Sequence, residues 1–80
     1  MTEDKRSTVP AFAVYGIEFV CWVSGKTGQY EWRSSCGRFV AGRDGHEFWA
    51  LADSEPVRRR FSNLKAAMAG AIQSRQERAA

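Results

Sequence analysis

The chain has 80 residues, a hydrophobic fraction of 44%, ten aromatic residues and a net charge of +3. This composition excludes a disordered chain, and the length allows one small domain with an economical core. No stretch reaches the ~20 apolar residues that a membrane-spanning helix needs, and the charged start MTEDKRSTVP lacks the apolar run of a secretory signal. We therefore expect a single cytoplasmic domain over residues 1–80, without a membrane partner and with disordered ends at 1–10 and 76–80.

Charge is distributed unevenly along the chain. From Val57 onward there are six basic residues and one acid, whereas the part up to Pro56 has six basic and eight acidic residues. The C-terminal part is therefore basic and the N-terminal part mildly acidic. This asymmetry is compatible with a polyanion or with an acidic protein surface as the partner.

The first predicted element is a strand over Ala11–Ser24, because its aromatic and β-branched residues alternate with a period of two. Gly16 is interpreted as a bulge that lets so long a strand bend. Alternate residues form the expected core face, which comprises Tyr15, Ile17, Phe19, Cys21 and Val23.

Three more strands follow, each separated from the last by glycine-bearing turn residues. They are YEWRSS (30–35), RFVAG (38–42) and HEFWALA (46–52), joined by turns at 25–28, 36–37 and 43–45. Successive hairpins of this kind predict an antiparallel meander of three to four strands.

Apolar residues at three- and four-residue spacing predict a helix near the end of the chain. They are Phe61, Leu64, Met68, Ala71 and Ile72. In one interpretation Ser54 caps a helix that starts at Pro56. In the other, which we favour, VRRRF (57–61) is a short edge strand and Ser62 caps a helix from Asn63 to about Arg75. The predicted fold class is α+β, with this helix packed on one face of the sheet.

The alternation also predicts what each face of the sheet carries. The inner set is Ile17, Phe19, Cys21, Tyr30, Trp32, Phe39, Phe48 and Ala50, and the outer set is Val20, Trp22, Glu31, Arg33, Arg38, Val40, Glu47, Trp49 and Leu51. An exposed patch of tryptophan and arginine is typical of a protein interface. A partner, a second copy of the chain or the N-terminal arm are the three candidates for covering it.

Arg58, Arg59 and Arg60 form a second candidate site. Three adjacent guanidinium groups suit contact with phosphates. The competing interpretation is that they are solvated charges that protect a sheet edge from aggregation.

The sequence contains too few residues of the types that support catalysis or cofactor binding to indicate either role. Asp44, His46 and Glu47 lie in and beside a predicted Asp-Gly hairpin turn, and the sequence places no nucleophile beside them. They therefore do not indicate general acid–base catalysis. Cys21, Cys36 and His46 do not have zinc-ligand spacing, and a cytoplasmic location favours free thiols over a disulfide. We expect a protein that is not an enzyme and has no catalytic residue, metal site or cofactor.

Two resemblances bear on function. The segments YEWRSSCGRFVAGRDG and FSNLKAAMAG resemble the sheet-plus-helix pattern of ethylene-response-factor DNA-binding domains and of phage-integrase arm-binding domains. This resemblance implies that Trp32, Arg33 and Arg38 contact DNA. In size and in the lack of catalytic residues, the chain resembles small phage or mobile-element proteins, including anti-CRISPR inhibitors, which implies a module that occupies a nucleic-acid-handling complex.

The preferred functional hypothesis is a binding protein that inhibits or modulates a protein complex that handles nucleic acid. Its expected partner-binding residues are Trp22, Trp49, Arg33, Arg38, Arg58, Arg59 and Arg60. The alternative is a direct DNA-binding protein that uses the sheet and the arginine-rich segment, and its binding should collapse as salt rises. A monomer and a homodimer are both compatible with the sequence.

Overall fold

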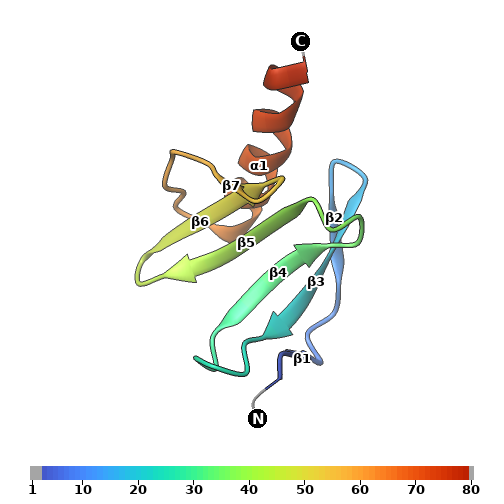
Figure 1. Ribbon diagram of the computed structural model, residues 1–80, viewed down its shortest axis with the longest axis vertical. Helices are drawn as coiled ribbons and strands as arrows, with labels where there is room; N and C mark the ends of the chain where they lie inside the picture. The colour runs from blue at the N-terminus through green and yellow to red at the C-terminus, as the bar shows by residue number, and fades with distance from the viewer. Residues whose placement is uncertain (1–2, 80) are drawn as a thin grey trace.

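The computed structural model describes residues 3–79, and the side chains of residues 3–75. Its described part contains one antiparallel sheet and one helix, α1 (Leu64–Ala79) (Figure 1). The sheet has the order β1-β3-β4-β5-β6-β7, and β2 pairs separately with β3. The strands are β1 (Lys5–Arg6), β2 (Phe12–Val14), β3 (Ile17–Val23), β4 (Tyr30–Ser34), β5 (Phe39–Asp44), β6 (Glu47–Ala52) and β7 (Glu55–Pro56).

The α+β class and the antiparallel meander are confirmed, but the number of strands is not. Strands β3 to β6 are the predicted meander, and each pairs with the next. The described residues form seven strands where three to four were predicted. The additional strands are short ones at the edges, β1 and β7, together with β2.

The predicted single strand over Ala11–Ser24 is wrong, because the chain reverses at Tyr15 and Gly16. Both residues have positive φ, 51° and 76°, and Val14 pairs with Ile17 across them. Positive φ at both central positions is typical of a two-residue hairpin turn whose twist matches the flanking strands. Gly16 is therefore the second turn residue of a β2–β3 hairpin and not a bulge.

The helix start also differs from the prediction. The side-chain Oδ1 of Asn63 accepts a hydrogen bond from the Ala66 N–H at 2.8 Å, so Asn63 is the N-cap and not Ser62. Residues 57–60 are not a strand, and of the predicted edge segment Phe61 alone forms a bridge, to Phe48. The alternative helix start at Pro56 is wrong as well, since Pro56 belongs to β7.

The core lies between α1 and the part of the sheet formed by β5 and β6. Ala67, Met68, Ala71 and Ile72 of the helix are buried against the sheet. The facing sheet residues include three alanines, which allow the helix backbone to approach closely: Phe19, Phe39, Ala41, Ala50 and Ala52. α1 packs on β5 and β6 and touches β2, and no element within residues 3–79 covers the opposite face of the sheet.

The predicted inner face is largely as expected. Phe19, Cys21, Phe39 and Ala50 are buried, and Ile17, Trp32 and Phe48 are half-buried beside them. Two tyrosines are exceptions. Tyr30 is 58% exposed at the start of β4, away from the strands that α1 covers, and Tyr15, which was predicted on the core face of the first strand, is 63% exposed in the β2–β3 turn.

Residues 1, 2 and 80, which belong to the predicted disordered ends, lie outside the described residues. The disorder and the single-domain assignment stay predictions. Within residues 3–79 no helix combines the length and the apolar character needed to cross a bilayer.

Candidate partner-binding face and arginine bulge

The outer face of the sheet places the two candidate tryptophans in one row that crosses four strands. Trp22 of β3 pairs with Glu31, Glu31 pairs with Gly42, and Gly42 pairs with Trp49 of β6. Since neighbouring strands lie about 4.8 Å apart, the two tryptophan backbones are roughly 14 Å apart. Both indoles are half-buried, on the face opposite α1.

A second row on the same face runs beside the first and is mostly aliphatic. Val20 pairs with Arg33, Arg33 with Val40, Val40 with Leu51, and Leu51 with the edge residue Pro56. Val20, Arg33, Val40 and Leu51 are all half-buried. We call the side chains Val20, Trp22, Arg33, Val40, Trp49 and Leu51 the outer face.

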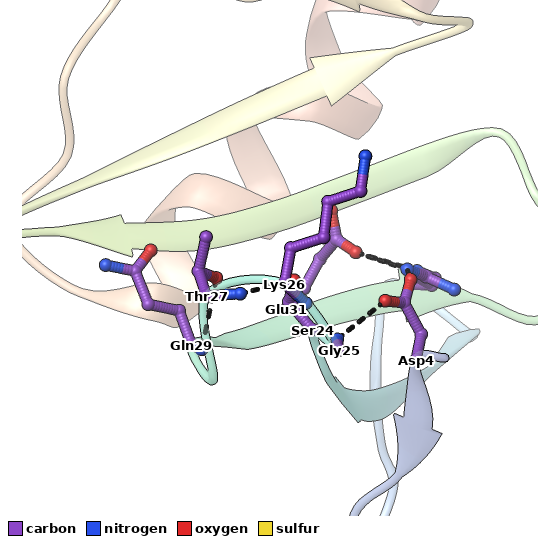
Figure 2. A network of polar contacts seen from close by, with 8 residues as sticks. Asp4, Ser24, Gly25, Lys26, Thr27, Gln29 and Glu31 are labelled. Carbon is purple, nitrogen blue, oxygen red and sulfur yellow. Dashed lines mark hydrogen bonds and ion pairs between the residues drawn. The ribbon is translucent and has the colours of Figure 1, made fainter. Parts of the chain in front are cut away.

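Arg33 joins Trp22 to two acidic side chains. Its guanidinium carbon lies 5.1 Å from the centroid of the Trp22 ring, a cation–π distance. One Nη of Arg33 is 2.5 Å from Asp4 and 2.6 Å from Glu31, and Nε donates to Glu31 at 2.8 Å. Figure 2 shows Asp4 and Glu31 on either side of this network, next to the 24–29 turn. The guanidinium is therefore fixed in place and its charge is compensated.

The same network shifts two pKa values. The pKa of Asp4 lies below its ordinary value because the Gly25 N–H donates to its carboxylate at 2.9 Å and because Arg33 is its ion-pair partner. The pKa of Arg33 is raised in turn, mainly by the hydrogen bond to Asp4. Asp4 thus ties the N-terminal segment both to the β3–β4 turn and to the outer face (Figure 2).

Trp49 lies over Gly42, its partner on β5. A Cβ at Gly42 would lie 2.3 Å from Cζ2 of the Trp49 indole and 2.5 Å from Cε2. The absence of a side chain at this position lets the indole lie flat against the strand, in the way that a strand glycine permits close approach. The sequence pattern marked Trp49 as outward but gave no orientation for its ring.

Arg38 does not join the outer-face cluster. It lies at the β4–β5 turn, where its Nε contacts Asp53 at 3.0 Å, and Asp53 also binds Arg75 of α1 at 2.7 Å. The hydrogen bond to Asp53 is the main cause that raises the pKa of Arg38. Arg38 therefore connects the turn to the helix through Asp53.

The three adjacent arginines form a bulge beside β6. Leu51 pairs with Pro56 and Phe48 bridges to Phe61. Phe48 and Leu51 are three residues apart on β6, whereas their partners Pro56 and Phe61 are five residues apart. The two extra residues displace the intervening segment from the ladder. We call residues 58–60 the arginine bulge.

The members of the arginine bulge differ in their contacts. Arg60 binds Asp44 at 3.3 Å and Glu47 at 3.6 Å, at the β5–β6 turn. Arg59 stacks on the ring of Phe61, with 5.3 Å from its guanidinium carbon to the centroid. Within the described side chains, neither Arg58 nor Arg59 has an ion-pair partner.

The remaining sequence candidates lie apart from both sites. Gly45 and His46 form the β5–β6 turn between Asp44 and Glu47. Both cysteines are free: Cys21 is buried, and Cys36 is exposed in the β4–β5 turn, 3.3 Å from the Ser34 hydroxyl. In the described part of the chain, no three His, Cys, Asp or Glu side chains are grouped so that they could hold a metal ion.

Several contacts of these sites were not predicted from the sequence. Glu31 and Arg33 lie two residues apart on one strand, so their pairing on one face was readable from the alternation. Asp4 lies 29 residues before Arg33 in the sequence, so no local pattern indicates that the two side chains meet.

No protein-family model, curated protein or solved structure matches this chain.

Proposed function

We propose that this protein is a non-enzymatic binding protein that docks on a protein partner through its outer face. The observation that carries the proposal is that Trp22 and Trp49 lie half-exposed in one row of a sheet face that no described element covers. Tryptophan and arginine are the residue types that most often dominate protein–protein binding energies. Aliphatic side chains in the neighbouring row, Val20, Val40 and Leu51, supply the apolar contact that surrounds such anchors.

The Arg33 side chain is held in one position by its contacts, and this supports a binding role. Two acids and the Trp22 ring already hold its guanidinium, so a partner does not have to immobilise it. Binding surfaces that are ordered beforehand lose less conformational entropy on association.

From residue 3 onward, the N-terminal segment leaves most of this face uncovered. β1 continues the sheet beyond β3, and Asp4 reaches the outer face at its edge through Arg33. This arrangement favours an external partner or a second copy of the chain over the N-terminal arm as the covering element.

The proposed partner is a cytoplasmic protein complex that handles nucleic acid, and the proposed effect is inhibition or modulation, as in anti-CRISPR-like proteins of phages and mobile elements. The net charge of +3 and the basic C-terminal part suit the acidic surfaces of a partner. The resemblance in size and in the lack of catalytic residues supports the same class of function.

Direct DNA binding by the sheet has less support. Arg33 and Arg38 both have carboxylate partners, which DNA phosphates would have to replace. Trp32, the third residue of that hypothesis, packs edge-on against Phe12 at 5.2 Å on the inner face. Phosphate contacts by these residues would therefore require existing interactions to break.

The test is affinity capture from a bacterial lysate, with and without nuclease, followed by binding of the identified complex in purified form. We expect one defined nucleic-acid-handling complex to be retained after nuclease treatment and to bind in a 1:1 ratio at moderate salt. The double variant Trp22→Ala/Trp49→Ala should lose this binding by at least about a hundredfold, as expected for two hot-spot residues.

Tyr30→Ala is the matched control, because it removes an exposed aromatic side chain from the opposite face. If it weakens binding as much as the double variant does, the outer face is not the docking surface. Capture of nucleic acid alone, lost after nuclease, would contradict the proposal. A second copy as the occupant would instead appear as a homodimer that the double variant dissociates.

A further inference from the structure

An open cavity of about 290 Å³ lies on the helix side of the sheet, beside the first residue of α1. The side chains that matter for its chemistry are Cys21, Tyr30, Trp32, Arg43, Phe48 and Leu64. The volume is roughly twice that of a dry apolar cavity of about 150 Å³ that binds benzene. The space is therefore large enough for two fused aromatic rings.

The strand register places the sheet residues of this cavity on one face. Ala41 of β5 is buried in the core beneath α1, and Trp32 is its partner on β4, so both side chains point to the helix side. Tyr30 and Arg43 lie two residues from Trp32 and Ala41 along their strands and therefore point the same way. Phe48 is the partner of Arg43 on β6 and shares this face as well.

The cavity is open because α1 does not extend over this end of the face. The helix packs on β5 and β6 and begins at Leu64, whereas the β3–β4 hairpin extends away from it (Figure 1). Val9, from the segment between β1 and β2, also borders the space and is 41% exposed. The aromatic surface of Tyr30 and Trp32 is thus left accessible.

The walls of the cavity are held in place by contacts within the protein. Trp32 packs edge-on against Phe12, with 5.2 Å between the ring centroids. Phe48 exchanges both backbone hydrogen bonds with Phe61, at 2.9 and 3.1 Å. Fixed aromatic walls favour an aromatic ligand, because its rings gain edge-on or offset contacts with them.

Arg43 is the one charged residue among the described side chains that line the cavity. The strand register seats it between Tyr30 on β4 and Phe48 on β6, so its charge adjoins the aromatic walls. Its Nε donates to the Gly45 carbonyl at 2.7 Å, which holds the guanidinium and leaves the two Nη groups. Two parallel N–H groups of a guanidinium match the two oxygens of a carboxylate.

Within the described side chains, no acid pairs with Arg43. Asp44 and Glu47, the acids nearest to it in the sequence, are partners on the opposite face of the sheet. Both bind Arg60, at 3.3 Å and 3.6 Å. The charge of Arg43 therefore stays available to a ligand.

We propose that this cavity binds a small aromatic carboxylic acid, with its rings against the aromatic walls and its carboxylate on Arg43. A single guanidinium beside apolar walls suits one negative charge on an apolar body. A phosphate monoester carries a charge of about −1.5 to −2 and would find no second cation among the described lining residues.

This site goes beyond the proposed protein docking and does not depend on it. Trp22 and Trp49, the anchors of that docking, lie on the opposite face of the sheet and do not line the cavity.

The test is a nuclear magnetic resonance titration of the ¹⁵N-labelled full chain with naphthoate, which has two fused rings and one carboxylate. The comparison ligands are naphthamide, which lacks the charge, octanoate, which lacks the rings, and inorganic phosphate, which lacks the apolar body. We expect naphthoate to bind at least about tenfold more tightly than each of them. It should shift the Trp32 indole N–H and leave those of Trp22 and Trp49 in place.

Arg43→Gln should weaken the binding of naphthoate about tenfold, the loss of one charge-assisted contact, and leave that of naphthamide unchanged. Arg58→Gln is the matched control, because it removes the same charge from an exposed position that does not line the cavity. We expect a change of less than about threefold for it, since solvent screens a distant exposed charge. Tyr30→Ala is a second variant, which should weaken both ligands about fivefold by removing part of the aromatic wall.

Four results would overturn the proposal: no binding of naphthoate, equal binding of any comparison ligand, an unchanged preference for the carboxylate in Arg43→Gln, or shifts at the Trp22 and Trp49 indoles instead of Trp32. The double variant Trp22→Ala/Trp49→Ala separates the two proposals. It should lose the protein partner while its affinity for naphthoate stays the same.

Discussion

The ring of Phe61 occupies the space in which a side chain at Gly70 would begin. A Cβ at Gly70 would lie 2.3 Å from Cζ of Phe61, which is far below van der Waals contact. Phe61 is buried, and its backbone is held by two hydrogen bonds to Phe48, so its ring has little freedom to move away. A glycine in the helix interior thus allows α1 to lie directly on the residue that closes the arginine bulge.

Gly70→Ala is expected to destabilise the fold despite the better helix propensity of alanine. The propensity gain of about 1 kcal/mol is exceeded by overpacking against Phe61, which costs about 1–3 kcal/mol. We expect a net loss of about 1 kcal/mol, measured by urea denaturation. In a Phe61→Leu background, which lacks the Cζ atom, the same substitution should become neutral or stabilising. Equal effects in both backgrounds would mean that Phe61 is not the cause.

Gly42→Ala should displace the Trp49 indole while leaving the fold intact. The new methyl group overlaps the indole, but the ring lies on the uncovered face and has room to move. We expect stability to change by less than about 1 kcal/mol, since the strand preference of alanine partly offsets the overlap. With fluorotryptophan, the ¹⁹F resonance of Trp49 should shift while that of Trp32 stays in place. An unchanged Trp49 resonance would contradict the observed packing.

Asn63→Ala should destabilise the helix more than Ser62→Ala does. The Asn63 side chain satisfies the N–H of Ala66 at 2.8 Å, and loss of an N-cap costs about 1 kcal/mol. Ser62 is exposed and should change stability by less than about 0.5 kcal/mol. The measurement is the midpoint of denaturation of each variant. The reverse order would restore Ser62 as the cap.

Asp4 makes stability depend on pH in the acid range. Its folded-state pKa lies below the ordinary value, so its contribution is complete above that ordinary value and is lost as the pH falls through the lowered one. The wild type should therefore lose stability on acidification more steeply than Asp4→Asn. Parallel curves of unfolding free energy against pH for the two proteins would show that the contacts of Asp4 with Gly25 and Arg33 do not persist in solution.

The Cys36 thiol should react at lower pH than an ordinary thiol. Its pKa is lowered, first by the Ser34 hydroxyl at 3.3 Å and then by the Arg38 backbone N–H. The pH midpoint of its alkylation by iodoacetamide should lie below that of a free thiol and should rise in Ser34→Ala. Ser35→Ala, an exposed neighbour, is the control. Cys21 is buried and should react only after unfolding.

Local patterns were sufficient to predict the middle of the fold. The hairpins of β3 to β6 follow from alternation with a period of two, which needs only neighbouring residues, and from glycines at turn positions such as Gly45. The apolar spacing from Leu64 to Ile72 predicts the helix for the same reason. The outward direction of Trp22 and Trp49 follows from the same alternation.

The turn at Tyr15 and Gly16 could not be predicted in this way, because tyrosine has no preference for positive φ. The short strands β1 and β7 are too brief to show an alternation of their own, and they exist through pairing with β3 and β6. The preference for Asn63 over Ser62 as the cap depends on where the helix axis starts, which its packing on β5 and β6 decides.

By itself, the sequence determined the class of fold, the central meander, the helix and the face that carries the tryptophans, because each depends on residues close together in the chain. Tertiary structure alone decided that Asp4 binds Arg33, that Trp49 lies over Gly42 and that Trp32, Arg43 and Leu64 line one cavity. The reason is physical: strand register and ion pairs join residues that are distant in sequence. The pairing of Phe48 with Phe61, made across such a distance, sets the two-residue slip that creates the bulge.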